Sequence, residues 1–219
     1  IETCWWLIKQ LWNKDLVYRD YKVTPHCPRC VTSLSSHEVS LGYQENTPDP
    51  SVYIKFRFSG HTKESVPPTA YNYLKELSHE MPIYFLAWTT TPWTLPGNTG
   101  LAVSPDSEYS VITTINENNT EALLVASPLV PEVIKSEYSV LKTFTGEEIA
   151  GLTYNPLYIA EENGVEVRYL GNENPLTKRQ LEAKIVSASF VSMENGTGIV
   201  HIAPAFGEVD LDIGFEKGL

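Results

Sequence analysis

Two segments that lie far apart in the chain hold the side chains best suited to chemistry. Residues 88–98 carry a run of threonine hydroxyls, then two prolines and a terminal amide at Asn98. Residues 196–210 carry an imidazole at His201 and a carboxylate at Asp210, nine positions further on. Hydroxyl, amide, imidazole and carboxylate groups supply hydrogen bonds and acid–base function. Taken by themselves, the two segments supply a cluster of hydroxyls on a proline-braced loop, and then an imidazole and a carboxylate nine positions apart.

Each of these groups also has an ordinary structural explanation. Threonine is a good strand residue, so a triplet of threonines at the end of an apolar run needs no function. A histidine at the end of a strand is more often a core residue than a catalyst. An aspartate at the start of a helix usually serves as a cap. The residue types alone therefore leave the structural and the functional interpretations open.

The wider sequence strings are more specific. Residues 88–98 read Trp-Thr-Thr-Thr-Pro-Trp-Thr-Leu-Pro-Gly-Asn, and residues 196–204 read Gly-Thr-Gly-Ile-Val-His-Ile-Ala-Pro. Together they resemble the editing insertion of class I isoleucyl-tRNA synthetases. The valyl and leucyl enzymes place Arg-Pro, an acidic residue and Thr where this chain has Thr-Pro-Trp-Thr, so Trp93 favours the isoleucyl branch. Family members commonly end the second segment with two acidic residues, whereas this chain has Val209 before Asp210.

The resemblance covers essentially the whole chain and implies a proofreading hydrolase. A synthetic site that accepts isoleucine discriminates only weakly against valine, and isoleucyl-tRNA synthetase is itself the standard example of this limit. A second site hydrolyses mischarged valyl-tRNA(Ile) and valyl-adenylate and excludes isoleucine by size. The implied partners are the 3′ end of tRNA(Ile), valine as the editing ligand and the remainder of a parent synthetase.

The resemblance also assigns roles to individual residues. Asp210 binds the substrate ammonium group, and His201 limits the size of the side-chain pocket and hydrogen-bonds near the ester or the ribose. The threonines hold the carbonyl, a ribose hydroxyl and the attacking water, and the tryptophans pack on the adenine. Asn98 fixes the loop or a water molecule. The implied catalytic residues are Thr90, Thr91, Asn98, His201 and Asp210, and the implied substrate-binding residues are Trp88, Thr89, Trp93 and Thr94.

Two alternatives remain open. The chain is also compatible with the editing domain of a valyl or leucyl synthetase, or with a non-catalytic barrel that binds the tRNA 3′ end. The ATP-site signatures His-Ile-Gly-His and Lys-Met-Ser-Lys-Ser are absent from the sequence. We therefore expect a piece of a larger enzyme that edits but does not itself activate amino acids.

Cys27 and Cys30 form a Cys-Pro-Arg-Cys segment whose spacing is typical of half of a zinc site. A structural zinc site needs four ligands. The alternative is two free thiols at a turn, and a redox role is disfavoured because no thioredoxin-like βαβ pattern surrounds the pair. In several isoleucyl synthetases the matching pair lies after the editing insertion. We therefore expect no cofactor for editing, and zinc only in the full-length enzyme.

The composition fits a soluble, cytoplasmic protein with one substantial core. The chain has 219 residues and a net charge of −11, which argues against a broad nucleic-acid surface but permits a pocket for a terminal nucleotide. Three cysteines do not make a disulfide framework. No apolar run approaches the length that spans a bilayer, so we expect no membrane partner.

The hydrophobic pattern predicts a mainly β fold. We expect a closed antiparallel β-barrel decorated by short helices over residues 48–219, preceded at residues 1–47 by a connective helix and cysteine knuckle. The predicted helical segments are 2–14, 69–80, 131–136 and 209–217. The predicted strands are 16–23, 52–58, 83–89, 100–103, 109–115, 122–126, 138–144, 165–170, 183–191 and 199–202.

Overall fold

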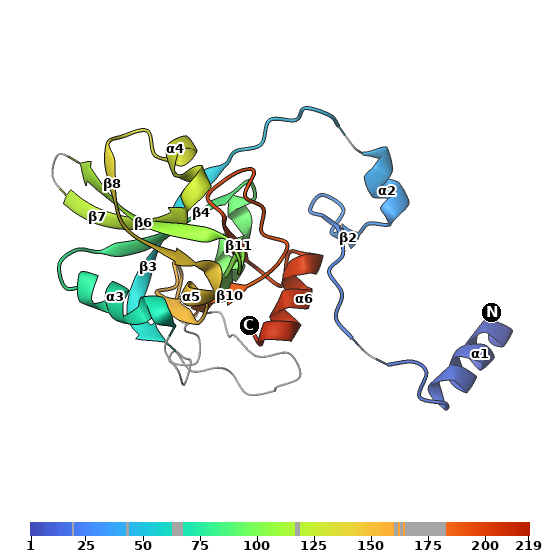
Figure 1. The fold of residues 1–219 in the computed structure, drawn as a ribbon. Helices are drawn as coiled ribbons and strands as arrows, with labels where there is room; N and C mark the ends of the chain where they lie inside the picture. The colour runs from blue at the N-terminus through green and yellow to red at the C-terminus, as the bar shows by residue number, and fades with distance from the viewer. Residues whose placement is uncertain are drawn as a thin grey trace. The chain divides into compact units, whose positions relative to one another are not determined.

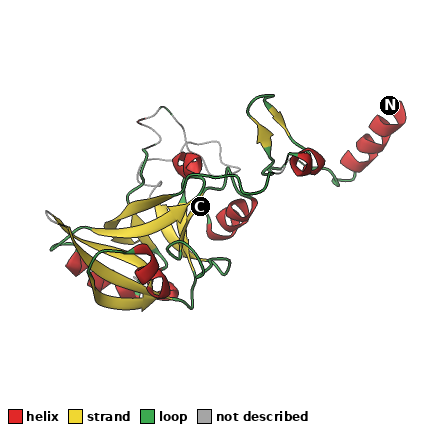
Figure 2. Cartoon of the chain, turned by 90° about the horizontal axis from the view of Figure 1, so that it is seen from above, coloured by secondary structure: helices red, strands yellow, loops and turns green. Residues whose placement is uncertain are grey.

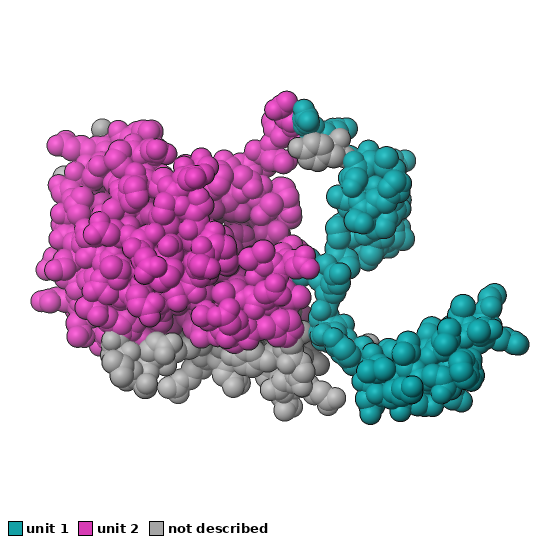
Figure 3. All heavy atoms as spheres, turned by 45° about the vertical axis from the view of Figure 1, so that its right-hand side comes forward, with its two compact units in different colours: residues 1–45 teal, residues 46–219 magenta. Residues whose placement is uncertain are grey.

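The structure is a computed structural model in which the chain forms two compact units. It describes residues 1–18, 20–42, 44–62, 68–116, 119–159, 162, 164 and 183–219. Unit 1 comprises Ile1–Glu45 and unit 2 comprises Asn46–Leu219 (Figure 3). The division falls after Glu45, whereas the sequence placed it after residue 47.

Unit 1 contains little regular structure. It consists of helix α1 (Glu2–Trp12), a small hairpin of β1 (His26–Cys27) and β2 (Thr32–Ser33), and helix α2 (Ser36–Leu41). A capping box starts α2, because the Ser35 hydroxyl accepts from the Glu38 N–H and the Glu38 carboxylate accepts from the Ser35 N–H. The predicted strand at 16–23 is wrong, since its described residues adopt no strand. A short alternating segment needs a neighbouring strand to pair with, and Tyr18 is exposed there instead.

Unit 2 is built on a mixed sheet of nine described strands in the order β11-β5-β10-β9-β3-β4-β7-β6-β8 (Figure 1). Most neighbours are antiparallel, but β4 pairs with β7, and β5 with β10, in parallel. The strands are β3 (Val52–Thr62), β4 (Ile83–Thr89), β5 (Gly100–Val103), β6 (Glu108–Asn116), β7 (Asn119–Ala126), β8 (Tyr138–Thr145), β9 (Leu152–Tyr154), β10 (Ala183–Ser187) and β11 (Ile199–Ile202).

The predicted closed antiparallel barrel needs correction. The two parallel pairs make the sheet mixed, and the hydrogen-bonded ladder of described strands ends at β11 on one side and β8 on the other. The sheet is nevertheless curved: β11 pairs with β5 and also lies beside β4, which is distant from it in the strand order. Counting short strands does not reveal which strands pair, so neither strand direction nor closure was accessible from the sequence.

Short helices surround this sheet, as Figure 2 shows from above. Helix α3 follows Pro68 and buries Ala70, Leu74 and Leu77, which recur at helical spacing on one face. The helical turn predicted at 131–136 is present as α4, which begins one residue earlier, at Val130, and ends at Val133. The helices of unit 2 are α3 (Thr69–Leu77), η1 (Pro92–Gly97), η2 (Ser127–Leu129), α4 (Val130–Val133), α5 (Gly146–Ile149) and α6 (Glu208–Lys217).

The core lies on the inner face of the sheet. Along β3, Phe56 and Phe58 are buried while Lys55 and Arg57 are exposed, as the period of a strand with one buried face requires. A second, smaller apolar cluster lies beneath α6 and includes Ile202 of β11. Helix α6 therefore packs on the edge of the sheet that carries the second motif.

Several predicted elements differ in extent. The predicted strand 165–170 lies outside the described residues. The strand predicted at 183–191 ends at Ser187, and β9 was not predicted because three residues are too few for a periodic signal. No helix in the described part of the chain has the length and apolar character needed to cross a membrane.

Candidate functional site

The threonine-rich loop begins where β4 ends. Thr89 is buried, and its hydroxyl oxygen accepts a hydrogen bond from the Thr91 N–H at 3.1 Å. Pro92 then starts η1, where a missing N–H costs nothing because the first turn leaves its donors unpaired. Thr89 thus holds the turn, whereas Thr90 and Thr91 are exposed on it.

Thr94 joins this loop to the second motif. It is buried within η1, and its hydroxyl donates to the Thr91 carbonyl oxygen at 2.7 Å. The same Oγ1 atom lies 2.9 Å from Nε2 of His201, which is 107 positions away in the chain. His201 sits in β11 opposite Leu101 of β5. The two segments that the sequence singled out therefore meet at a buried hydrogen bond.

His201 is a neutral side chain at neutral pH. Only 6% of its surface is exposed, and this burial lowers its pKa below the ordinary value of 6.5. The nearby Asp210 carboxylate opposes that effect and raises the pKa, but desolvation is the larger cause. Within the described residues, Nδ1 is buried and has no hydrogen-bond partner. The imidazole thus has one nitrogen held by Thr94 and one buried nitrogen without a partner among the described residues.

Asp210 lies in the first turn of α6 but does not cap that helix. Gly207 is the N-cap and makes no side-chain cap bond. Oδ2 of Asp210 instead accepts the Ala203 N–H at 2.9 Å, just beyond the end of β11. Gly207 permits this approach, since a Cβ added there would lie 3.0 Å from Cγ of Asp210. The carboxylate is thus folded back toward the strand that carries His201.

Asn98 is engaged with the protein through both ends of its amide. Nδ2 donates to the Gly100 carbonyl oxygen at 2.9 Å, and Oδ1 accepts from the Tyr154 hydroxyl at 2.6 Å. These contacts tie the end of the threonine loop to β5 and β9. Of the two roles expected for Asn98, the structure gives it the contacts of a loop-fixing residue.

The two tryptophans have different surroundings. Trp88 is half-buried and alternates with the buried Thr89 along β4, so the two point to opposite faces of the strand. Its ring packs against Gly196, where an added Cβ would approach within 2.8 Å. Trp93, in contrast, is 60% exposed on η1. Of this pair, Trp93 has the more accessible ring for a base.

Phe206 is a candidate that the sequence analysis did not single out. Its ring is 53% exposed and lies against Gly97 at the end of η1, where an added Cβ would come within 2.6 Å of it. The only signal in the sequence was its position between the histidine and the aspartate of the second motif. The structure places this aromatic ring beside the threonine loop.

The Gly-Thr-Gly turn before β11 fixes the position of the second motif. Gly198 has a φ of +70°, and a Cβ there would lie 2.3 Å from the Ala126 side chain. The buried Tyr109 hydroxyl donates to the Gly198 carbonyl at 2.7 Å and accepts from the Ser104 N–H at 2.8 Å. Burial raises the pKa of Tyr109 to about 12, so this hydroxyl keeps its proton.

The cysteine pair belongs to unit 1. The Cys30 N–H donates to Sγ of Cys27 at 3.4 Å, and this backbone bond is the main cause that lowers the pKa of Cys27. Such a bond fits a thiolate that serves as a metal ligand, but the pair supplies only two of four ligands. In the described part of the chain, no group of three or more His, Cys, Asp or Glu side chains is placed to hold a metal. The described residues therefore do not complete a zinc site.

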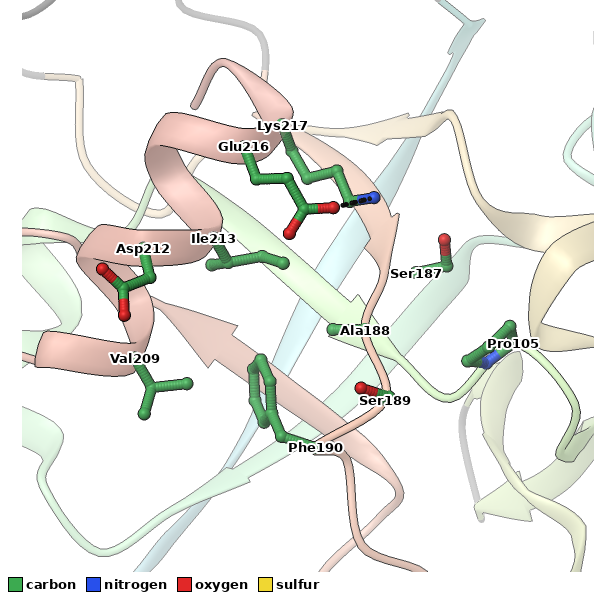
Figure 4. A pocket seen from close by; sticks show the side chains of 10 residues that line it. All are labelled: Pro105, Ser187, Ala188, Ser189, Phe190, Val209, Asp212, Ile213, Glu216 and Lys217. Carbon is green, nitrogen blue, oxygen red and sulfur yellow. Dashed lines mark ion pairs between the residues drawn. The ribbon is translucent and has the colours of Figure 1, made fainter.

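Two surface cavities lie away from the predicted site residues. One, of about 310 Å³, is bounded by α6 and the segment 187–190, with Asp212 and Glu216 on its helical wall (Figure 4). The other, of about 340 Å³, adjoins it at Ser187 and Lys217. Val209 of the second segment lines the first cavity, but none of the predicted site residues lines either one.

Comparison with known proteins identifies the class of this chain. Residues 1–206 match the family model described as tRNA synthetases class I (I, L, M and V), so the chain belongs to that family. Among its curated relatives is the isoleucine–tRNA ligase of Dehalococcoides mccartyi (strain CBDB1), which is 43% identical over the whole of this chain and 21% of the ligase. The isoleucine–tRNA ligase of Thermus thermophilus is 40% identical over the whole chain and 18% of the ligase. The chain thus spans about a fifth of the length of these relatives.

The fold resembles editing domains of known structure. The crystal structure of GlLeuRS-CP1 matches with a TM-score of 0.52 and 18% identity, over 75% of this chain and 59% of that one. The editing domain of the P. knowlesi cytosolic leucyl-tRNA synthetase matches with a TM-score of 0.50 and 14% identity, over 80% of this chain and 68% of that one. At these identities the similarity shows a shared fold.

Proposed function

We propose that this chain is the editing domain of an isoleucyl-tRNA synthetase and hydrolyses valine attached in error to tRNA(Ile), together with valyl-adenylate. The observation that carries the proposal is the meeting of Thr94, His201 and Asp210 where the two motifs come together. The fold shared with leucyl-tRNA synthetase editing domains supports an editing role. The identity to isoleucine–tRNA ligases supports the choice of amino acid.

The substrate ammonium group would bind Asp210. One oxygen of this carboxylate takes the Ala203 N–H, and the remaining lone pairs are free to accept from a cation. The neutral state of His201 matters here, because a positively charged imidazole beside Asp210 would compete with the substrate for the carboxylate. Because buried His201 stays neutral, the Asp210 carboxylate would form its ion pair with the substrate ammonium group and not with the imidazole.

The hydrolytic step would use water and the hydroxyls of Thr90 and Thr91, two exposed residues of the loop. Water adds to the ester carbonyl carbon, the bond from that carbon to the ribose oxygen breaks, and the ribose oxygen takes a proton. Valine and an uncharged tRNA end are released. Aminoacyl esters are reactive, so holding the carbonyl and the water in the right geometry supplies much of the acceleration.

Selection against isoleucine would come from the buried pair of Thr94 and His201. This pair would form one wall of the side-chain pocket, and the additional methylene of isoleucine would clash with it. Outside this wall, the exposed rings of Trp93 and Phe206 suit the terminal adenine, since unpaired bases stack on aromatic side chains. The site would thus bind the terminal adenine at its entrance and the amino acid side chain deeper inside.

The rest of a synthetase would deliver the tRNA end. The chain carries a net charge of −11, so it has little electrostatic attraction of its own for phosphates. It also spans about a fifth of the length of its ligase relatives. Such an enzyme would work with tRNA in the cytoplasm.

Hydrolysis of two charged tRNAs tests the proposal. The chain, and a full-length synthetase containing it, would each be mixed with valyl-tRNA(Ile) and with isoleucyl-tRNA(Ile). We expect loss of valine to be the faster reaction in both proteins. Equal rates for the two substrates would remove the size selection. Binding of the tRNA end without hydrolysis in the full-length enzyme would favour the non-catalytic alternative.

A further inference from the structure

The hydroxyl group of Thr94 has one proton and two neighbours that compete for it. The Thr91 carbonyl oxygen lies 2.7 Å from Oγ1, and Nε2 of His201 lies 2.9 Å from it. A carbonyl oxygen only accepts hydrogen bonds, whereas a neutral imidazole nitrogen either donates or accepts. Both contacts are satisfied together only when Thr94 donates to Thr91 and accepts from an Nε2–H of His201.

The opposite arrangement would break one contact and bury an unpaired donor. If Thr94 donated to His201, the Thr91 carbonyl oxygen would lose the hydroxyl and keep only its bond from the Thr94 N–H, at 3.0 Å. The imidazole hydrogen would then sit on Nδ1, which is buried and has no partner within the described residues. A buried N–H without an acceptor is rarer and less tolerable than an acceptor without a donor. Both considerations favour the same tautomer.

We propose that Thr94 is a positioning residue that sets the tautomer of His201, keeping the hydrogen on Nε2 and leaving Nδ1 as a bare acceptor for the substrate. This inference rests on the proposed function and adds to it the chemistry of one contact. A side chain that is 94% buried, with an unpaired acceptor, is completed by a ligand that brings an O–H or N–H. An aminoacyl-adenosine offers both, as ribose hydroxyl and as ammonium group.

The tautomer is measured directly by long-range ¹H–¹⁵N correlation NMR on the histidine-labelled chain without substrate, at pH 8. The signal of His201 is assigned by its loss in His201→Gln. We expect hydrogen on Nε2 in the wild type and in Thr94→Ser, which keeps the hydroxyl. In Thr94→Val, which has a similar shape but no hydroxyl, we expect hydrogen on Nδ1 or a mixture. Hydrogen on Nδ1 in the wild type, or an unchanged signal in Thr94→Val, would overturn the proposal.

The consequence for activity is measured on valyl-tRNA(Ile) with the same variants. Loss of one such contact should slow hydrolysis about tenfold in Thr94→Val, and Thr94→Ser, which keeps the hydroxyl, should be the faster of the two variants. A slow Thr94→Val with an unaltered tautomer would mean that Thr94 acts on the substrate itself. If the wild type has the expected tautomer but hydrolyses nothing, the proposed function fails and the tautomer assignment stands.

Two modified substrates distinguish the donors. A tRNA ending in 2′-deoxyadenosine lacks one ribose hydroxyl, and a tRNA charged with the α-hydroxy analogue of valine lacks the ammonium group. The effect of Thr94→Val should disappear with whichever substrate lacks the group that donates to Nδ1. If the effect is equally large with both, neither group is the donor and the assigned contact is wrong.

Discussion

Replacing Asp210 by asparagine isolates the charge on which the proposed chemistry depends. The carboxylate has two tasks: it accepts the Ala203 N–H at 2.9 Å, and it would bind the substrate ammonium. Asparagine has nearly the same volume, and its side-chain oxygen can still accept the Ala203 N–H, but it carries no negative charge. Alanine would end both tasks and leave the buried Ala203 N–H without its acceptor.

The expected losses follow from these contacts. A hydrogen bond to a charged group contributes about 1.5–3 kcal/mol, which corresponds to a fall of about 10- to 150-fold in kcat/KM for Asp210→Asn. We expect its free energy of unfolding to remain near that of the wild type. Asp210→Ala should show the same or a larger fall in kcat/KM, and should also lose about 1–3 kcal/mol of stability.

The assay is hydrolysis of valyl-tRNA(Ile), with urea unfolding of each variant in parallel. Asp212→Asn is the matched control, because Asp212 is an exposed carboxylate on the same helix, two positions away. It removes the same charge from the chain without touching the Ala203 contact. Asp210→Asn activity within twofold of the wild type would refute the reasoning. An equal loss in Asp212→Asn would show that net charge, and not this carboxylate, is responsible.

Three further outcomes are expected. Because burial lowers the pKa of His201, the native state stays neutral while the unfolded histidine takes up a proton below about 6.5. Its contribution to stability is therefore complete above that pH and declines as the pH falls, and His201→Gln should make the free energy of unfolding less dependent on pH between 7.5 and 5. Tyr109→Phe leaves two backbone partners unpaired and should cost about 1–3 kcal/mol in urea unfolding, whereas Tyr53→Phe, at an exposed ring, should cost little. Cys27 and Cys30 should bind zinc weakly in this chain, and a stoichiometric metal that resists chelators in elemental analysis would contradict that expectation.

The strands whose bounds were predicted best are those flanked on both sides by residues that end a strand. The bounds of β4, β5 and β11 agree with prediction, because each is an apolar run between prolines, glycines or polar turns. The predicted strand 16–23 had the right residue types but lacked a strand to pair with. Pairing depends on residues far away in the chain, and so does strand direction, which explains why the parallel β4–β7 pair was missed.

The same distinction applies to the site. The resemblance carried by the motif strings predicted Thr94, His201 and Asp210 as members of one site. They did not show that Thr94 bonds to the imidazole, or that Asp210 accepts the Ala203 N–H instead of capping its helix. Those contacts are set by how β11 lies against β5 and how α6 packs beneath the sheet edge. A contact between segments 107 positions apart leaves no local pattern.

The place of β11 at the end of the strand order makes the position of His201 depend on the local stability of one strand. Among the described strands its ladder partner is β5 alone, over the four pairs from Ile199 to Ile202. Protein regions open in units, and a strand with one ladder partner opens more readily than a strand at the centre of a sheet. An opening of this edge would carry His201 away from Thr94 while most of the core stayed folded. Amide exchange in β11 would then measure how often His201 separates from Thr94, and the proposed site would come apart at temperatures below those that unfold the whole unit.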